Sequence, residues 1–173
     1  MEKLNRQNFK SLMSSLSMPG KIKKIEPLYN SGLLAIANIL LYREVSFFYD
    51  GEEDMALIEA ISYPKRAKVE NADYIFSDTV QANLLQLAKR GNYVNPDLSS
   101  MLVFKCNSSS HIKVAISGPG IDGKKEITLP CDEGFIEVLK EKNNNYPLGV
   151  EIYFLNEENE LLALSRTTKV EIL

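Results

Sequence analysis

The sequence predicts an α/β fold with three layers, α/β/α, built around a mixed β-sheet. Segments with helical spacing alternate with short apolar segments through the first half of the 173-residue chain, which is typical of crossover units with parallel strands. The second half is richer in strands. Its last two strands, residues 150–155 and 161–164, are apolar on both sides, as expected in the middle of a covered sheet.

Length and composition favour one soluble globular domain spanning residues 1–173. The net charge of -3, from 20 basic and 23 acidic residues, argues against a nucleic-acid-binding protein. Charged residues interrupt the apolar ones near the N-terminus, and no apolar run approaches the roughly 20 residues needed to span a bilayer. We therefore expect a cytoplasmic protein without membrane contact. Its cysteines, Cys106 and Cys131, are expected to be reduced, with a disulfide as the alternative.

The first predicted helix begins near Asn5, whose side chain can cap it, and its apolar residues follow at helical spacing. These apolar residues are Phe9, Leu12, Met13 and Leu16. Pro19 and Gly20 end the helix, because the residue before a proline is pushed out of the α region and glycine permits a sharp turn. A short strand over residues 21–25 is expected to follow.

Ser31 is the predicted cap of a second helix over residues 32–42, which is apolar around nearly its whole circumference. Such a helix is typically buried in the core, and a contact surface for another subunit is the alternative. A strand over residues 45–49 follows. Asp50 and Glu53 then resemble a capping pair for a third helix. The apolar residues of that helix are Leu57, Ile58 and Ile61, and Pro64 ends it.

Predicted strands and helices continue to alternate in the middle of the chain. A strand over residues 74–76 precedes a fourth helix with Asp78 and Gln81 as its capping pair and Gly91 as its end.

The strands that follow are richer in polar connections. Residues 101–106 and 111–117 are predicted to form a hairpin through the polar turn 107–110, and residues 127–129 add another short strand. Asp132 can cap a fifth helix.

Arg166, Thr167 and Thr168 form the candidate anion or interface site. They directly follow the last apolar strand, and in open α/β sheets the ends of strands are the usual place for a ligand or partner. A guanidinium group suits phosphate and carboxylate recognition, and the two threonines add hydroxyl donors. The alternative is a structural ion pair between Arg166 and a nearby glutamate such as Glu171. The sequence alone leaves both alternatives open.

Residues 117–121 contain Gly118, Pro119 and Gly120, and glycines of this kind can bring backbone N–H groups close to a phosphate. However, Pro119 removes one donor, and the segment fits neither a P-loop nor a dinucleotide-binding pattern. We therefore predict a tight structural turn here.

Other reactive side chains are few. His111, the single histidine, is predicted to be exposed at a strand start, with a general base as the alternative. Cys106 and Cys131 are predicted to be buried or half-buried small residues rather than reactive thiolates. No nucleophile, base and oxyanion donor can be assembled. The sequence thus predicts no catalytic residue, no metal and no cofactor.

Four segments, taken together, resemble the H subunit of the carbon–phosphorus lyase system for phosphonate breakdown, the PhnH family. They are residues 9–20, 116–121, 146–151 and 161–171. The turn residues inside them are Pro19, Gly20, Gly118, Gly120, Pro147 and Gly149. Two departures stand out: Ser165 occupies a position where the family has proline, and the chain is short, with lean middle connections.

The resemblance implies a fold related to pyridoxal-phosphate-dependent transferases, without their cofactor site. It implies a homodimer in isolation and membership of a core complex with the G, I and J subunits. That complex transfers methylphosphonate to C1′ of the ATP ribose, releasing adenine, before the J subunit breaks the C–P bond. The H subunit is implied to be auxiliary. The alternative function is an independent binder or enzyme acting on a phosphate or phosphonate through the Arg166 strand end.

Overall fold

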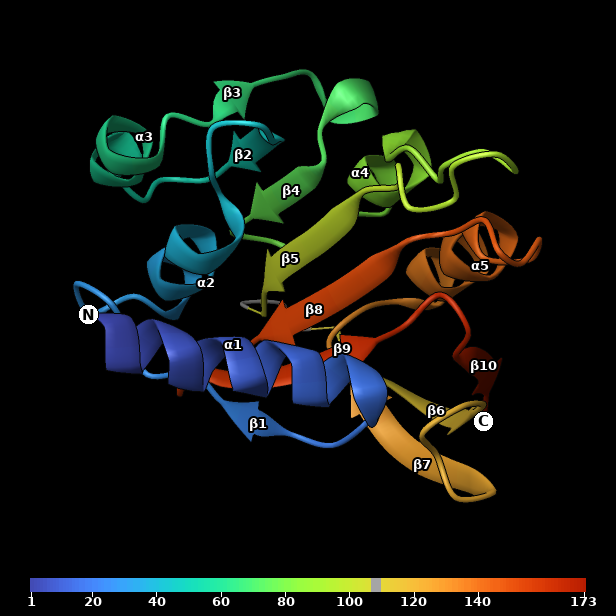
Figure 1. Ribbon diagram of the computed structural model, residues 1–173. Coiled ribbons are helices and arrows are strands. Elements are labelled where there is room, and N and C mark those ends of the chain that lie inside the picture. The colour runs from blue at the N-terminus through green and yellow to red at the C-terminus, as the bar shows by residue number, and fades with distance from the viewer. Residues whose placement is uncertain (107–109) are drawn as a thin grey trace.

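A computed structural model describes residues 1–106 and 110–173, in which helices and strands alternate (Figure 1). In chain order the elements are α1 (Glu2–Ser17), β1 (Lys23–Lys24), α2 (Gly32–Leu40), β2 (Ser46–Asp50), α3 (Ala56–Ser62), β3 (Lys65–Arg66), the 3₁₀ helix η1 (Val69–Asn71), β4 (Tyr74–Ser77), α4 (Ala82–Leu87), β5 (Met101–Lys105), β6 (Ile112–Ser117), β7 (Lys124–Leu129), α5 (Glu133–Lys142), β8 (Glu151–Leu155), β9 (Glu160–Leu164) and β10 (Lys169–Ile172).

The large sheet has seven strands in the order β1-β9-β8-β5-β4-β2-β3. β3, β2, β4, β5 and β8 run parallel, whereas β9 is antiparallel to β8, and β1 is antiparallel to β9. The predicted mixed sheet is therefore confirmed. The last two apolar strands lie inside it, as their two-sided apolar pattern indicated.

The predicted hairpin of residues 101–106 and 111–117 is wrong. β5 pairs with β4 and β8, whereas β6 belongs to a separate three-stranded antiparallel sheet in the order β10-β6-β7. β5 is buried on both faces and lies inside the large sheet, where β4 and β8 occupy both of its edges and leave none for β6. Of the predicted turn, residues 107–109 lie outside the described residues.

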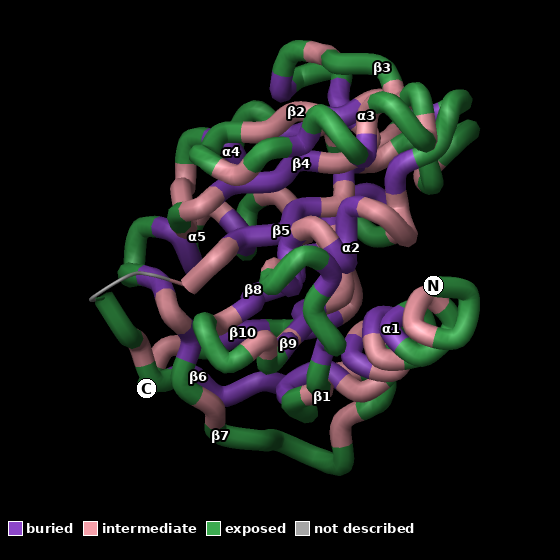
Figure 2. Tube along the Cα trace, turned by 90° about the vertical axis from the view of Figure 1, so that its left-hand side faces the viewer, coloured by how far each residue is buried: buried purple, intermediate pink, exposed green. Residues whose placement is uncertain are grey.

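Two apolar clusters cover the two faces of the large sheet. Adjacent residues of one strand enter opposite clusters, as Leu102 and Val103 of β5 do, both with 0% exposure. α1, α2 and α3 pack on one face, and α4, α5 and the small sheet pack on the other. Figure 2 shows the central strands β5 and β8 of the large sheet as mostly buried, and the edge strand β3 as exposed. None of the helices that the structure describes is long and apolar enough to cross a bilayer.

α1 departs from the prediction at its start and in its buried face. It begins at Glu2 rather than near Asn5, and Phe9 and Met13 are about half exposed. The buried face instead contains Asn8, whose side-chain amide donates to the Glu26 carbonyl over 2.8 Å and accepts from the Glu26 N–H over 2.9 Å. A buried asparagine with both amide groups bonded can occupy a core position, so the apolar stripe is turned partly toward solvent.

Two of the five predicted caps are confirmed, and the other three, including Asn5 inside α1, are wrong. Ser31 Oγ accepts from the Leu34 N–H over 3.1 Å, and Asp132 Oδ1 accepts from the Phe135 N–H over 2.8 Å. Neither predicted pair, Asp50 with Glu53 or Asp78 with Gln81, caps a helix. α3 begins at Ala56, whose N–H donates to Asp54, and α4 begins without a side-chain cap. The carboxylates of Glu53 and Asp78 lie close to Lys105 instead.

Candidate functional site

The four segments that resemble one family meet in space, and their glycines make this possible. A Cβ on Gly120 would lie 2.0 Å from the Ser17 carbonyl oxygen, and a Cβ on Gly118 would lie 2.7 Å from the Thr167 carbonyl oxygen. Both glycines also have positive φ angles, 82° and 128°. A side chain at Gly120 would push this loop away from the end of α1, and one at Gly118 would push it away from the turn that follows β9.

Arg166, in the turn that follows β9, connects the segment 146–151 to this arrangement. Its Nε donates to Glu151 Oε1 over 2.6 Å and one terminal nitrogen donates to Glu151 Oε2 over 2.8 Å. That nitrogen also donates to Ser99 Oγ over 2.8 Å. The other terminal nitrogen donates to the carbonyls of Pro96, over 2.8 Å, and Pro147, over 3.1 Å. We call Arg166 and these four partners the Arg166 cluster.

The Arg166 cluster uses the whole donor capacity of the guanidinium group, which has five N–H bonds. The side chains of Arg166 and Glu151 are only 17% and 18% exposed. The hydrogen bond with Glu151 is the main reason that the pKa of Arg166 is raised above its ordinary value. The structural ion pair is therefore present, but its partner is Glu151. The predicted partner, Glu171, pairs with Lys124 instead, at 2.6 Å.

The hydroxyl groups beside Arg166 close a tight turn. Ser165 Oγ lies 3.0 Å from Thr167 Oγ1 and 3.0 Å from Thr168 Oγ1, and the Thr168 N–H donates to the Ser165 carbonyl over 2.9 Å. The Ser165 N–H donates to Thr168 Oγ1 over 3.2 Å. The serine at this position thus takes part in the turn through its own hydroxyl group.

The direction of β9 decides where the Arg166 cluster lies. Because β9 runs antiparallel to β8, it ends beside the start of β8. The cluster therefore lies at what we call the amino edge of the parallel strands, where β2, β4, β5 and β8 begin. Ligands of open α/β sheets usually bind at the opposite edge. Anion binding by Arg166, Thr167 and Thr168 stays a prediction.

The carboxyl edge, where β2, β4, β5 and β8 end, holds a second polar group that the sequence did not indicate. Lys105 Nζ contacts Glu53 Oε1 and lies 3.6 Å from Asp78 Oδ1. Tyr49 OH donates to the same Asp78 oxygen over 3.0 Å and accepts from the Glu53 N–H over 2.7 Å. Ser31 Oγ, the cap of α2, is bonded to Glu53. We call these residues the Lys105 cluster.

The Lys105 cluster combines one cation with two carboxylates and is adjacent to a cavity of about 270 Å³. Burial alone would lower the pKa of Lys105, but the hydrogen bond and charge of Glu53, with Asp78, raise it. The pKa of Tyr49 is raised, chiefly by burial and also by Asp78. The sequence contained a signal for this cluster. Lys105 follows the apolar core of β5, and Asp78 directly follows β4, so both lie at the ends of neighbouring parallel strands.

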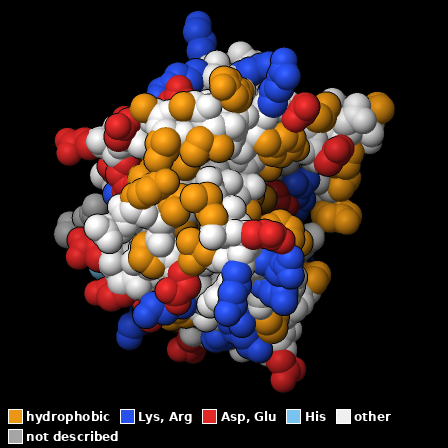
Figure 3. Space-filling view, turned by 60° about the vertical axis from the view of Figure 1, so that its left-hand side comes forward, with side chains coloured by type: hydrophobic (Ala, Val, Ile, Leu, Met, Phe, Trp, Pro, Cys, Tyr) orange, Lys and Arg blue, Asp and Glu red, His pale blue; other side chains and the backbone are white. Residues whose placement is uncertain are grey.

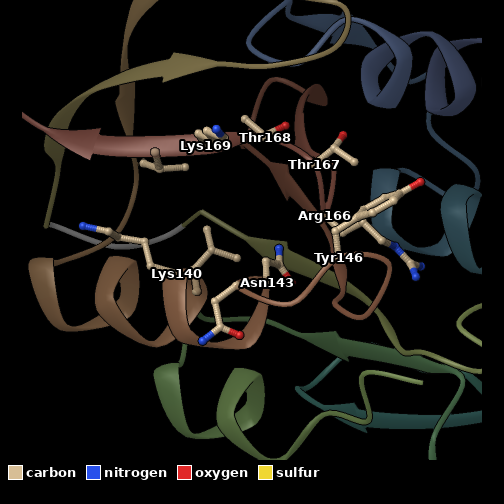
Figure 4. A pocket seen from close by; sticks show the side chains of 10 residues that line it. Lys140, Asn143, Tyr146, Arg166, Thr167, Thr168 and Lys169 are labelled. Carbon is tan, nitrogen blue, oxygen red and sulfur yellow. The ribbon is translucent and has the colours of Figure 1, made fainter. Parts of the chain in front are cut away.

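A third feature is a cleft between α5 and β10, which Figure 4 shows from close by. It has a volume of about 440 Å³ and is lined by Leu139, Lys140, Asn143, Asn144, Tyr146, Arg166, Thr167, Thr168, Lys169 and Val170. Lys140 on α5 and Lys169 on β10 lie on opposite walls, and Tyr146 and Thr167 lie near one end. The guanidinium group of Arg166 points away from the cleft, toward its own cluster (Figure 4). We call this space the α5–β10 cleft.

The remaining candidate side chains lie where the sequence predicted. His111 is exposed just before β6. Cys131 is 3% exposed and Cys106 is half-buried, and both thiols are free. Burial raises the pKa of both thiols to about 12, so they are protonated at neutral pH. Cys106 and His111 line one cavity of about 360 Å³.

The turn residues of the family segments have special backbone geometry. Gly20 follows Pro19 with a φ of 76°, and its carbonyl accepts from Lys125 Nζ over 2.7 Å. Pro147 follows a cis peptide bond. Gly149 has a φ of 145°, and a Cβ there would lie 3.0 Å from Arg166 Cβ.

These observations define a class of protein. It is an α/β protein with helices on both faces of a mixed sheet. Its distinctive sequence segments meet around the turn that contains Arg166, whose guanidinium donors are all bonded within the protein. Within the described part of the chain, no three His, Cys, Asp or Glu side chains are grouped to hold a metal ion.

The family model described as bacterial phosphonate metabolism protein (PhnH) matches residues 2–171 of this chain. The chain belongs to the PhnH family, and its role lies in bacterial phosphonate metabolism. A search of curated proteins gave no match.

Proposed function

We propose that this chain is an auxiliary subunit of the carbon–phosphorus lyase core complex, with the G, I and J subunits as partners. In this role it supports transfer of methylphosphonate to the ribose of ATP, which gives α-D-ribose 1-methylphosphonate 5-triphosphate. The family membership is the observation that carries the proposal. A homodimer in isolation, a cytoplasmic location and a fold relationship to pyridoxal-phosphate-dependent transferases belong to the same proposal.

The geometry of the family segments supports an auxiliary role. Their polar groups are bonded within the protein: Arg166 binds Glu151 and three further oxygen acceptors, two of them in the loop before β5, and the hydroxyl groups of residues 165, 167 and 168 bond among themselves. Such groups hold segments together and leave few donors for a reacting phosphonate. The segments most characteristic of the family therefore build a scaffold.

The surface supports a partner-binding role. Several large apolar side chains are exposed on the helices that cover one face of the large sheet, including Phe9 and Met13 of α1 and Leu57 and Ile61 of α3. Figure 3 shows hydrophobic side chains spread across the face that includes the left side of Figure 1, between groups of charged ones. Exposed apolar area of this kind is typical of surfaces that contact other proteins.

Co-purification tests the proposal. The tagged chain is mixed at cell-like concentrations with purified G, I and J subunits of the same system and recovered on the tag. We expect all three subunits to be retained, and synthesis of the ribose methylphosphonate product to require this chain. Recovery of none of them would reject the proposal.

The alternative function, an independent binder or enzyme for a small phosphate or phosphonate, is tested on the isolated protein. Its basis was a free guanidinium group at a strand end, and the guanidinium group of Arg166 is fully occupied by protein acceptors. Calorimetric titration with ATP and with methylphosphonate should therefore give no binding heat. Turnover of either compound by the isolated chain would favour the alternative instead.

A further inference from the structure

The α5–β10 cleft contains two cations that the fold itself does not use. Among the described residues, neither Lys140 nor Lys169 takes part in a side-chain hydrogen bond or ion pair, and both are exposed. By contrast, Lys89, Lys105 and Lys124 each contact a carboxylate. The charges of the cleft are therefore available to a ligand.

A carboxylate near the cleft already feels these charges. The pKa of Glu171 is lowered mainly by its hydrogen bond with Lys124, and Lys140 and Lys169 add to the effect through their charges. Both lysines therefore favour the ionised form of a carboxyl group in this region.

Apart from the Asn144 amide and the Tyr146 hydroxyl group, which belong to exposed residues, the rest of the cleft is apolar or already bonded. Leu139 and Val170 are 3% and 5% exposed and contribute an apolar surface, while Tyr146 is 73% exposed beside them. The side-chain amide of Asn143 is bonded to both backbone groups of Val150, over 2.8 and 3.2 Å. The hydroxyl groups of Thr167 and Thr168 are bonded to Ser165.

This distribution of groups favours an extended ligand over a small anion. A small dianion such as a phosphonate is held by several donors that converge on one point. Here the two free cations lie on opposite walls (Figure 4), and the side-chain donors of residues 143, 166, 167 and 168 are bonded within the protein. An extended segment with separated carboxylates and an apolar side chain between them satisfies both walls and the apolar surface.

We infer that the α5–β10 cleft binds an acidic peptide segment of a partner subunit, with carboxylates at Lys140 and Lys169 and an apolar side chain against Leu139, Val170 and Tyr146. This inference rests on the proposed function, because it names the contact through which the assembly would hold this chain. Complementary charge at the rim of an interface sets specificity and association rate, and an exposed aromatic residue is a common anchor.

Charge reversal tests the inference in the assembly of purified G, I and J subunits. The double variant Lys140→Glu/Lys169→Glu should bind that assembly about tenfold more weakly than the wild type, with a reduced dependence of affinity on salt. The matched control is Lys65→Glu/Lys68→Glu, which changes the net charge equally at and beside β3, the far edge strand of the large sheet. The control should bind like the wild type. The neutral pair Lys140→Gln/Lys169→Gln, with thermal unfolding of every variant, separates lost binding from lost folding.

Zero-length carbodiimide cross-linking of the wild-type assembly locates the occupant. Lys140 or Lys169 should be joined to an aspartate or glutamate of a partner subunit. Equal binding by the cleft variant and the control would overturn the cleft inference and leave the proposed function standing. The cleft inference also fails if ATP or methylphosphonate occupies the cleft, or if the two lysines cross-link only to a second copy of this chain. Failure of the wild-type chain to bind the three subunits would reject both the cleft inference and the proposed function.

Discussion

The two edges of the parallel strands each contain a cation held by carboxylate, and they differ in how completely that cation is bound. At the amino edge, Arg166 has a two-point contact with Glu151 and three further acceptors from two other segments. At the carboxyl edge, Lys105 contacts Glu53 and Asp78 and is 26% exposed. One positive charge there faces two negative ones, so the Lys105 cluster has a charge imbalance that the Arg166–Glu151 pair does not have.

The difference teaches that a family's most recognisable residues need not be its reactive ones. Arginine offers five donors in a fixed plane and can join several backbone segments at once, whereas lysine is a single mobile charge. The amino edge therefore joins the loop before β5, the turn before β8 and the turn after β9. The carboxyl edge has fewer fixed contacts and borders an open cavity. Substitutions at the two edges test this contrast.

The largest effect is expected for Arg166→Ala. The substitution removes five hydrogen bonds and leaves Glu151, which is only 18% exposed, without its cation. Breaking a mostly buried pair in this way costs about 3–5 kcal/mol of unfolding free energy. Urea unfolding followed by circular dichroism measures it. Arg166→Lys should recover only a minor part, since one ammonium group cannot reach all the acceptors.

The opposite result for Arg166→Ala would reverse the comparison. If the variant unfolds like the wild type and still assembles, yet cells lose growth on phosphonates, then Arg166 acts on a ligand and the amino edge is the functional one.

A smaller loss is expected for Gly120→Ala, which tests whether the family segments need their close contact. The new Cβ would lie 2.0 Å from the Ser17 carbonyl oxygen at a φ of 82°, so the backbone must shift. We expect a loss of about 2–3 kcal/mol in the free energy of unfolding. Gly123→Ala is the matched control: its φ is 66°, but no atom lies within 4 Å of its Cβ. It should cost about 1 kcal/mol, the conformational part alone. Equal losses for the two variants would contradict the close-contact explanation.

Lys105→Met tests how much the carboxyl edge contributes to the free energy of unfolding. It leaves Glu53 and Asp78 facing each other without a cation, and we expect a loss of about 1.5 kcal/mol, less than for Arg166→Ala because the site is more solvated. Lys113→Met, at an exposed lysine of β6, should change stability by less than about 0.5 kcal/mol. A wild-type unfolding curve for Lys105→Met, combined with lost complex activity, would assign the carboxyl edge to ligand contact.

The sequence predicted elements better than it predicted partners. Apolar spacing and the caps Ser31 and Asp132 located α2 and α5, and two-sided apolar runs placed β8 and β9 inside a sheet. The hairpin of β5 and β6 failed because strand pairing depends on what covers each face of each strand, a long-range property that a local polar turn does not encode. The caps Asp50 and Asp78 failed for a related reason, since the ends of neighbouring strands, far apart in sequence, compete for the same carboxylates.

The candidate site shows the same limit. The sequence identified Arg166 and the possibility of an ion pair, because chemistry and position relative to a strand are local. The sequence named Glu171 as the partner, but the partner is Glu151. Antiparallel pairing of β8 and β9 brings Glu151 to Arg166, whereas Glu171 on β10 faces Lys124. The Lys105 cluster draws on α2, β2, β4 and β5 and becomes visible only after the order of strands is known.

The smallest expected effect concerns Asp73, which lines the same amino-edge cavity as Arg166 and Glu151. Burial alone would raise the pKa of Asp73, but Lys89 and two hydrogen bonds from Ser46 lower it below its ordinary value. A carboxyl group whose pKa is lower in the folded state stabilises the fold above its unfolded pKa, about 3.9, and loses that contribution as pH falls through the folded value. Asp73→Asn should therefore be less stable than the wild type by about 0.5–1 kcal/mol at pH 7, since Asp73 and Lys89 are both partly solvated. The difference should shrink steadily below about pH 4 in thermal unfolding measured across the acid range. An amide oxygen at position 73 can still accept the hydrogen bonds from Ser46. If the stability difference stays unchanged in acid, the substitution must have distorted these hydrogen bonds. The amino edge would then depend on the shape of this side chain more than on its charge.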